Sequence, residues 1–318
     1  MWKKVVGYGL LSVVVLAGAV LGWAWLRKPA QRPGPKIRVV ATPERLARGR
    51  KVWLMADCDV CHSRHDLKNF AVLETGLGQG NQVPDKAMGE IDIPNITPDV
   101  ETGIGTWTDG EKMRAIREGV DKDGNALFPM MPYENFRHMS DEDATALVAY
   151  LDSLPPVRHS VPKMKVPFFL SLLLKGAPKP LDRPVPPPDI SNRHARGVYL
   201  TTVAGCEECH TQSKGGGLDL SKHFAGGVKF DVFGKVVYSA NITPDADTGI
   251  GTWSLPYFRQ RFRTYRNSWP ERFTLMPWHN FAQLSDEDIE SIYYFLNEQK
   301  PVANKVNPFR EQQVAELR

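Results

Sequence analysis

The sequence predicts a mainly α-helical protein, with an N-terminal transmembrane helix followed by two tandem copies of one small helical domain. Three observations predict it. An uncharged apolar run occupies Val5 to Leu26, the pattern Cys-x-x-Cys-His occurs twice, and the other landmarks of the first copy recur 145 to 148 positions later. We interpret this recurrence as a duplicated domain, because chance matches do not keep one spacing.

The first 28 residues are expected to anchor the chain in a membrane. As a helix rising about 1.5 Å per residue, Val5 to Leu26 would span about 33 Å, enough to cross the hydrocarbon core. A cleaved secretory signal is the alternative. The run is longer than a usual signal core, however, and Trp23-Ala-Trp25 is more typical of an aromatic belt at a membrane surface. We therefore favour an uncleaved anchor over residues 1–28.

The net charge of +4 belongs to the flanks of this run. Four of the 40 Lys and Arg residues lie in residues 1–28, which hold no Asp or Glu, so the remaining 36 equal the 36 acidic residues of the chain. A formally neutral soluble part gives no reason to expect nucleic acid as a partner.

Beyond the anchor, composition divides the chain. A stretch rich in Pro, Lys and Arg follows it and is expected to be an extended tether, and a Pro-rich linker separates the two copies. The predicted segments are the tether at 29–41, domain 1 at 42–155, the linker at 156–190, domain 2 at 191–302 and a C-terminal tail at 303–318.

One segment of the linker, Pro167 to Leu174, is strongly apolar but too short to span a membrane. We favour packing across the seam between the two domains. A patch that touches the membrane or a partner subunit is the alternative.

Each copy is predicted to be a unit of four helices. In the first, Thr42-Pro43-Glu44 is typical of a helix start, with proline at the first helical position and an acid in the first turn. Cys58 to His62 should open a short second helix. Thr108-Asp-Gly-Glu111 is a capping box for the third, and Ser140-Asp-Glu-Asp143 caps a last helix that Pro155 and Pro156 stop.

The second copy departs at its third helix. There Ser254-Leu-Pro-Tyr257 lacks the acidic partner of a capping box and instead carries proline inside the first turn.

The four cysteines all lie in Cys58-Asp-Val-Cys61-His62 and Cys206-Glu-Glu-Cys209-His210, the pattern of covalent c-type haem attachment. Two thiols three positions apart on one helical turn can form thioethers to two vinyl groups, and the next imidazole is carried under the iron. A redox Cys-x-x-Cys pair, a zinc half-site and a disulfide framework are the alternatives, but none needs that histidine. The sequence thus predicts two haem c groups, with His62 and His210 as iron ligands.

A methionine is predicted as the second iron ligand in each copy, because its soft thioether favours ferrous iron and raises the potential. Met131 and Met276 follow the two haem motifs at matched spacing, in Met131-Pro-Tyr133 and Met276-Pro-Trp278. Met130 is the neighbouring alternative. Alignment of the copies places Leu275 opposite Met130, so Met131 is preferred.

Residues 42–302 resemble two class I cytochrome c domains of the membrane-bound kind that serve periplasmic alcohol, sugar-acid and aldehyde dehydrogenases. Besides the haem motifs, the resemblance rests on the Met-Pro-Tyr loop and on two further stretches that each occur twice. They are Asn95-Ile-Thr-Pro-Asp99 with Thr102-Gly-Ile-Gly-Thr-Trp107, and Asn241-Ile-Thr-Pro-Asp245 with Thr248-Gly-Ile-Gly-Thr-Trp253. Cytochrome subunits of this family often carry three haem motifs, whereas this chain has two.

The resemblance implies crossed terminal helices, in which Gly49 and Gly197 allow close approach of Tyr150 and Phe295. It also implies a set of residues that line the haem edge and bond its propionates, for which a role in turns and core packing is the equal alternative. This set is Asn95, Trp107, Asn241 and Trp253.

These features predict a dihaem cytochrome c that carries single electrons and has no substrate of its own. The expected donor is a dehydrogenase or the quinol pool, and the expected acceptor is another cytochrome or an oxidase. Because c-type cytochromes are assembled on the outer side of the bacterial inner membrane, we expect a single-pass anchor there and haem domains in the periplasm. A dihaem peroxidase is one alternative, which the paired methionines disfavour. A permanent subunit of a larger respiratory or photosynthetic complex is the other.

Overall fold

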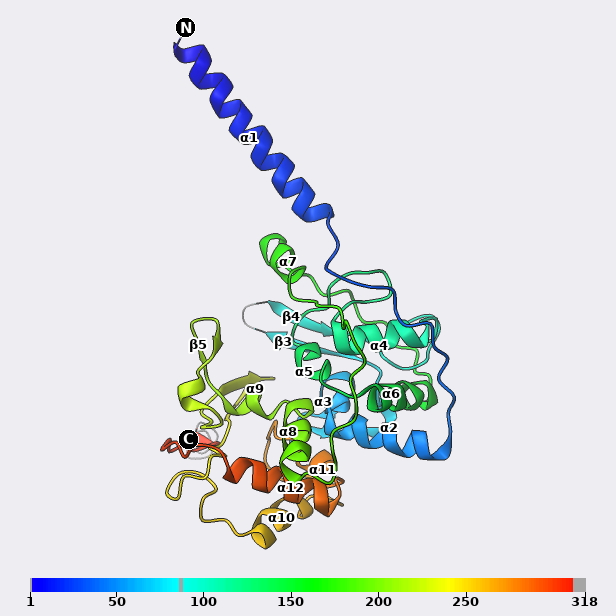
Figure 1. Cartoon of the computed structure of the whole chain (residues 1–318), viewed down its shortest axis with the longest axis vertical. Coiled ribbons are helices and arrows are strands. Elements are labelled where there is room, and N and C mark those ends of the chain that lie inside the picture. Colours follow the sequence, from blue (N-terminus) through cyan, green and yellow to red (C-terminus); the bar gives the residue numbers. More distant parts are fainter. Residues whose placement is uncertain (1, 86–87, 311–318) are drawn as a thin grey trace.

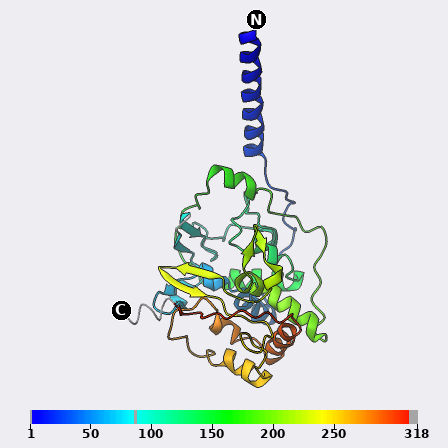
Figure 2. The same ribbon diagram turned by 90° about the vertical axis from the view of Figure 1, so that its left-hand side faces the viewer.

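The computed structural model describes residues 2–85 and 88–310, which are mainly helical. Helix α1 (Trp2–Leu26) projects alone from a globular body, as two views at right angles show (Figures 1 and 2). Its stretch Val6–Leu26 is long and apolar enough to cross a membrane, and it contacts no other part of the described chain closely enough to be buried.

The body contains two sets of elements in the same order, which we call the first repeat (residues 42–155) and the second repeat (residues 191–302). The helices of the first repeat are α2 (Pro43–Met55), α3 (Cys58–His62), η1 (Glu74–Gly76), α4 (Asp109–Glu118), α5 (Tyr133–Phe136) and α6 (Asp141–Ser153). Those of the second are α8 (Arg193–Val203), α9 (Cys206–His210), η2 (Leu220–Lys222), α10 (Leu255–Arg263), α11 (Trp278–Phe281) and α12 (Asp286–Asn297), and α7 (Phe168–Leu174) lies between the repeats.

Each repeat also contains two short antiparallel hairpins, which the sequence analysis did not predict. In the first repeat β1 (His65–Asp66) pairs with β2 (Ala71–Val72), and β3 (Asn81–Asp85) pairs with β4 (Gly89–Ile93). In the second β5 (Ser213–Lys214) pairs with β6 (Gly217–Leu218), and β7 (Lys229–Val232) pairs with β8 (Lys235–Tyr238). The predicted tail at 303–318 lies partly outside the described residues; its first part returns to β8, where Tyr238 donates from its backbone to the carbonyl of Pro308.

The predicted helix starts are confirmed. Thr42 caps α2, and Thr108 forms both bonds of a capping box with Glu111 at the start of α4. Ser140 caps α6. Helix α10 begins after Ser254 with proline in its first turn, as its different sequence predicted. Each cap accepts from a backbone N–H three residues later, which satisfies one of the donors that a helix start leaves free.

In each repeat the first and last helices cross at a glycine. A Cβ atom placed on Gly49 of α2 would lie 2.0 Å from the carbonyl oxygen of Ala146 and 2.7 Å from the Cβ of Tyr150, both in α6. On Gly197 of α8 it would lie 2.4 Å from the carbonyl oxygen of Ser291 and 2.6 Å from the Cβ of Phe295. The close approach implied by the resemblance is therefore confirmed.

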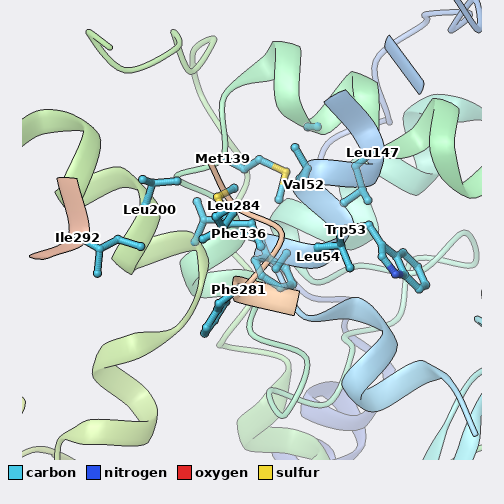
Figure 3. Packing of buried hydrophobic residues seen from close by; sticks show 14 of the residues in the cluster. Val52, Trp53, Leu54, Phe136, Met139, Leu147, Leu200, Phe281, Leu284 and Ile292 are labelled. Atoms are coloured by element: carbon cyan, nitrogen blue, oxygen red, sulfur yellow. The ribbon is translucent and has the colours of Figure 1, made fainter. Parts of the chain in front are cut away.

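One apolar core continues from the first repeat into the second. Figure 3 shows its centre, where Val52 and Met139 of the first repeat lie beside Leu284 of the second, with Leu200 and Ile292 extending the cluster toward α8 and α12. Met139 is fully buried and Leu284 nearly so. The two repeats thus share a buried apolar interface.

Polar contacts at the edge of this interface obey an approximate two-fold relation. Asp143, in the first turn of α6, accepts a hydrogen bond from Arg48 of its own repeat and another from the hydroxyl of Tyr199 of the other. Asp288, in the first turn of α12, pairs with Arg196 of its own repeat at 2.7 Å and with Lys51 of the other at 2.5 Å. Arg48 corresponds to Arg196 in the repeat, and Lys51 to Tyr199.

The expected tether is extended, but it is bound along the body. Lys28 donates from its ammonium nitrogen to the side-chain oxygen of Asn125 at 2.9 Å, and Arg32 pairs with Glu118 at 3.0 Å. Farther on, the backbone N–H of Val39 donates to Asp109. The end of α1 is therefore held in a fixed place relative to the first repeat.

The preferred role of the apolar linker segment is wrong. Helix α7, which covers most of Pro167 to Leu174, has no buried residue, whereas a seam between two domains would cover its side chains. It lies at the edge of the body next to the end of α1 (Figures 1 and 2).

We expect Gly197→Ala to destabilise the protein by about 3 kcal/mol, the upper part of the range for overpacking, because the added methyl group meets a backbone oxygen that cannot turn away. Chemical denaturation measures the free energy of unfolding. Gly217→Ala is the matched control, since a Cβ there meets nothing within 4 Å. Equal stability of the two variants would contradict the tight crossing.

Candidate functional site

The two cysteine motifs form short helices with the same entry geometry. Asp57 before α3 and Gly205 before α9 both have left-handed backbones, with φ of 51° and 65°. Glycine adopts this conformation freely and aspartate tolerates it better than most residues, which explains both residue types at this position. The turn starts each helix abruptly, so that its cysteines and histidine project from one side.

Each motif histidine is held by one ring nitrogen. His62 and His210 are buried, and their Nδ1 atoms donate to the carbonyl oxygens of Pro94 at 2.8 Å and Ala240 at 2.7 Å. A carbonyl only accepts, so the proton is on Nδ1 and Nε2 keeps its lone pair. Burial lowers the pKa of both rings, which favours the neutral form that binds metal. Such a carbonyl partner is typical of metal-ligating histidines.

The cysteine alternatives receive no support from the described residues. All four thiols are free of disulfide bonds, and residues 2–85 and 88–310 contain no group of three His, Cys, Asp or Glu side chains placed to share a metal ion. Burial raises the pKa of Cys61 to about 11. A thiol that stays protonated is unlike the thiolate of a redox-active Cys-x-x-Cys pair.

The two predicted methionines occupy identical turns. In each, the proline after methionine has φ and ψ near those of an inverse γ-turn, −81° and 55° at Pro132 and −80° and 61° at Pro277. The methionine carbonyl accepts from the residue after the proline at 2.8 Å in both repeats. Because the fixed φ of proline builds this turn, the backbone conformation after Met131 matches that after Met276. Met130 borders the same cavity but is about half exposed, at 49%.

Both motifs and both methionine turns line one cavity of about 1550 Å³. The volume exceeds the roughly 300–1,000 Å³ of a usual small-molecule site. The wall is largely apolar and includes Ile104 and Trp107 in the first repeat and Ile250 and Trp253 in the second. The wall of one cavity thus holds two cysteine pairs, two imidazoles and two thioethers.

Asn95 and Asn241 line the same cavity, but their amides are committed elsewhere. The Nδ2 atom of Asn95 donates to Thr102 and to the carbonyl of Val157 at 2.7 Å, and Asn241 donates in the same way to Thr248 and Val302. Both amide hydrogens are used, so neither is left for a propionate. These bonds support the role in turns and core packing, and a place at the haem edge stays a prediction for the two asparagines, as it does for Trp107 and Trp253.

A contact that the sequence analysis missed joins the first motif to the other repeat. Asn280 of α11 donates from Nδ2 to Asp59 at 2.6 Å and to Asp57 at 3.1 Å. Asp59 and Asn280 are almost fully buried. Burial raises the pKa of Asp59 to about 6, against the lowering effect of the Asn280 hydrogen bond. Asn280 lies 223 positions after Asp57 and 221 positions after Asp59, so no local pattern in the sequence signals these hydrogen bonds.

Comparison with known proteins identifies the family. Residues 46–155 match the cytochrome c family. The chain is 32% identical to a dihaem cytochrome c of Cereibacter sphaeroides, over 90% of this chain and 95% of that protein. The chain belongs to the c-type cytochromes.

Other relatives of this cytochrome are parts of larger proteins or complexes. It is 32% identical to the cytochrome c subunit of gluconate 2-dehydrogenase from Pantoea cypripedii, over 78% of this chain and 58% of that protein. It is 39% identical to one of the subunits of nicotinate dehydrogenase from Pseudomonas putida over 58% of this chain, but only 15% of that protein. The dihaem cytochrome is thus the relative whose length this cytochrome matches.

Membership of the family implies covalently bound haem c, and the residues present fit it. Each repeat brings to the cavity two cysteines on one helical turn, an imidazole whose Nε2 is free and a methionine on a proline turn. Bound haem supplies a one-electron iron couple.

Replacement of Asp59 by asparagine should change the pH dependence of stability. A carboxyl whose pKa is raised from 3.8 to about 6 on folding holds its proton more tightly in the folded state, so its ionisation costs stability as the pH rises through this window. Relative to Asp59→Asn, the native protein should lose about 2 kcal/mol between pH 4 and pH 7. At about 1.4 kcal/mol per pKa unit the full shift corresponds to about 3 kcal/mol, but part of this loss occurs below pH 4, near the unfolded pKa of 3.8. Denaturant titrations across this range measure the difference.

The control is Glu74→Gln, which changes an exposed carboxyl on η1. This variant should follow the native protein at every pH. A constant stability gap between the native protein and Asp59→Asn would show that burial does not disfavour the ionised carboxylate.

Proposed function

We propose that this cytochrome is a membrane-anchored periplasmic electron carrier with two haem c groups, one in each of two tandem cytochrome c domains at residues 42–155 and 191–302. The observation that carries the proposal is that one cavity is lined by both cysteine motifs and by both predicted methionines. Either motif and its methionine, taken as one set, would alone describe a monohaem cytochrome.

The residues of each set have separate roles in this proposal. Cys58 and Cys61 attach the first haem, and Cys206 and Cys209 attach the second. His62 and His210 bind iron through Nε2, and the carbonyls that accept from Nδ1 fix the ring and increase its basicity. Met131 and Met276 close the opposite side, where the thioether favours the ferrous state.

The shared cavity supports transfer between the two sites within one chain. The second cysteine pair and its helix line the same wall as the first, so the attached groups would meet without crossing a layer of protein. Both ligands of each iron come from the protein, which leaves no coordination position for a substrate. This supports a carrier without a reaction of its own and disfavours a dihaem peroxidase.

The partners follow from the relatives. Those named as cytochrome subunits are parts of gluconate, alcohol and fructose dehydrogenases. We propose that a periplasmic dehydrogenase or a quinol-linked complex donates electrons and that a cytochrome or oxidase accepts them. The names of the relatives equally favour a second candidate, a cytochrome held permanently in such a complex.

The membrane assignment rests on α1. Its apolar stretch Val6–Leu26 is not buried against the body, and Trp23 and Trp25 lie near its end, where aromatic residues favour the membrane surface. We propose that α1 remains in the mature protein and crosses the bacterial inner membrane once.

Met131→Ala and Met276→Ala should each alter one haem and leave the other unchanged. Loss of one thioether should remove about half of the near-infrared sulfur-to-iron absorption and lower one of two potentials in a redox titration, because the ferrous state loses its favoured ligand. Met130→Ala is the matched control, since its side chain is exposed, and should preserve both signals.

The native protein should also be low-spin at both irons and slow to bind carbon monoxide. Rapid peroxide turnover, or a native high-spin haem, would favour the peroxidase instead.

The mature chain should retain residues 1–28 and carry two covalent haems. Native membranes should release it only with detergent, because the exposed apolar helix has no place in water. Intact-mass spectrometry after denaturation reads both features at once. A soluble product that begins near Ala30 would show a cleaved signal, and a mass with one haem would contradict the dihaem assignment.

A further inference from the structure

Helix α7 presents bulky apolar side chains to its surroundings. Phe169 and Leu173 are 71% and 74% exposed, and Phe168 is 45% exposed. Phe169 and Leu173 lie four residues apart and so share one face of α7, and the ring centroids of Phe168 and Phe169 are 5.3 Å apart, so the three form one patch. Soluble surfaces rarely gather exposed aromatic and leucine side chains in this way without a partner.

The patch lies where α1 leaves the membrane in the proposed arrangement. Lys175, directly after α7, donates from its ammonium nitrogen to the backbone carbonyls of Ala24, at 3.4 Å, and Trp25. The last carbonyls of a helix lack internal partners and carry partial negative charge, which a lysine ammonium satisfies. Both views show α7 as the part of the body nearest to the end of α1 (Figures 1 and 2).

The bound tether fixes this placement. Lys28 and Arg32 hold the first residues after α1 against Asn125 and Glu118 of the first repeat. A loose tether would let the globular body rotate freely relative to the membrane. A bound tether keeps α7 at the level of the aromatic residues that end α1.

The chain on either side of α7 carries charge of one sign, although Arg158 in this stretch pairs with Glu101. Residues 153–181 contain no Asp or Glu, and their basic residues are Arg158, Lys163, Lys165, Lys175 and Lys179. An apolar helix flanked by lysines is the composition that binds the boundary between headgroups and acyl chains, with attraction to anionic lipids.

We propose that α7 is a second membrane contact, which lies in the interfacial layer of the outer leaflet of the inner membrane and binds anionic lipid through its flanking lysines. The inference rests on the proposed anchoring by α1. The occupant is lipid rather than a protein because the patch adjoins the end of the membrane-spanning helix and is carried on the same fixed support. The contact sets the orientation of the body, with the first repeat toward the bilayer.

The test uses the full chain in vesicles that contain phosphatidylglycerol, with a nitroxide attached to a single introduced cysteine. The native cysteines are consumed by haem in the proposed function, so only the introduced thiol reacts. Phe169→Cys reports on α7, and Leu220→Cys is the matched control, because Leu220 is 70% exposed on η2 of the second repeat. Val13→Cys reports on α1.

Relaxation by oxygen, which concentrates in lipid, is compared with relaxation by a water-soluble nickel chelate. We expect the oxygen-to-nickel ratio of the Phe169→Cys label to be several-fold above that of the Leu220→Cys label and to fall when phosphatidylglycerol is replaced by phosphatidylcholine. Equal ratios at Phe169→Cys and Leu220→Cys, with Val13→Cys still in lipid, would overturn the α7 proposal and leave the anchor standing. That outcome would favour a protein partner for the patch. A Val13→Cys label in water would instead refute the anchor.

Discussion

Two buried carboxylates determine how the repeats are arranged. Asp143 and Asp288 lie in the first turns of the last helices of the two repeats. Each is bound by an arginine of its own repeat and by one residue of the other repeat, Tyr199 for Asp143 and Lys51 for Asp288. Burial acts to raise the pKa of Asp288, but the hydrogen bonds and charges of Lys51 and Arg196 outweigh it and hold that pKa below its ordinary value. Removal of one cation would leave a buried charge without a full set of partners, which is strongly unfavourable. The contacts therefore specify one relative placement of the repeats, and with it the single cavity into which both ligand sets open.

The sequence was sufficient where the signal is local. Caps at Thr42, Thr108 and Ser140 act over three residues. The close approach at the helix-crossing glycines was implied by the resemblance to class I cytochrome c domains, and it occurs in both repeats. The remaining features depend on distant parts of the chain. The hairpins have strands of two to five residues, too short for a periodic pattern, and the bonds of Asn280 to Asp57 and Asp59 cross between repeats. The apolar character of α7 was visible in the sequence, but its surroundings were not, because they depend on where the tether places α1.

The asparagine motifs show that a repeated residue can serve the fold itself. Asn95 and Asn241 make the same bonds in their repeats, to a threonine seven residues later and to the carbonyls of Val157 and Val302. These bonds fasten the segment after the last helix to the cavity wall. Duplication preserves whatever the fold needs as well as whatever the chemistry needs, so spacing alone cannot separate the two. For the methionines the structure adds an independent reason, since both thioethers sit on proline turns that face the cavity.

The two cysteine motifs offer the same types of side chain to the cavity, but the charged residues around them differ. At the first motif, the left-handed residue is Asp57, and it lies with Asp59 beneath Asn280 in the interface. At the second motif, Gly205 takes the same backbone conformation without a carboxylate, and Glu207, at the position equivalent to Asp59, pairs with His223 nearer the surface. A buried negative charge beside an iron stabilises its oxidised form, whereas an exposed and paired one is screened. The charge of Asp57 raises the pKa of Cys206 and Cys209 as well as that of Cys58 and Cys61, so Asp57 acts on both motifs. The asymmetry that remains is Asp59, and under the proposed ligation its ionised form would favour the oxidised state of the first site and make the second site the stronger electron acceptor.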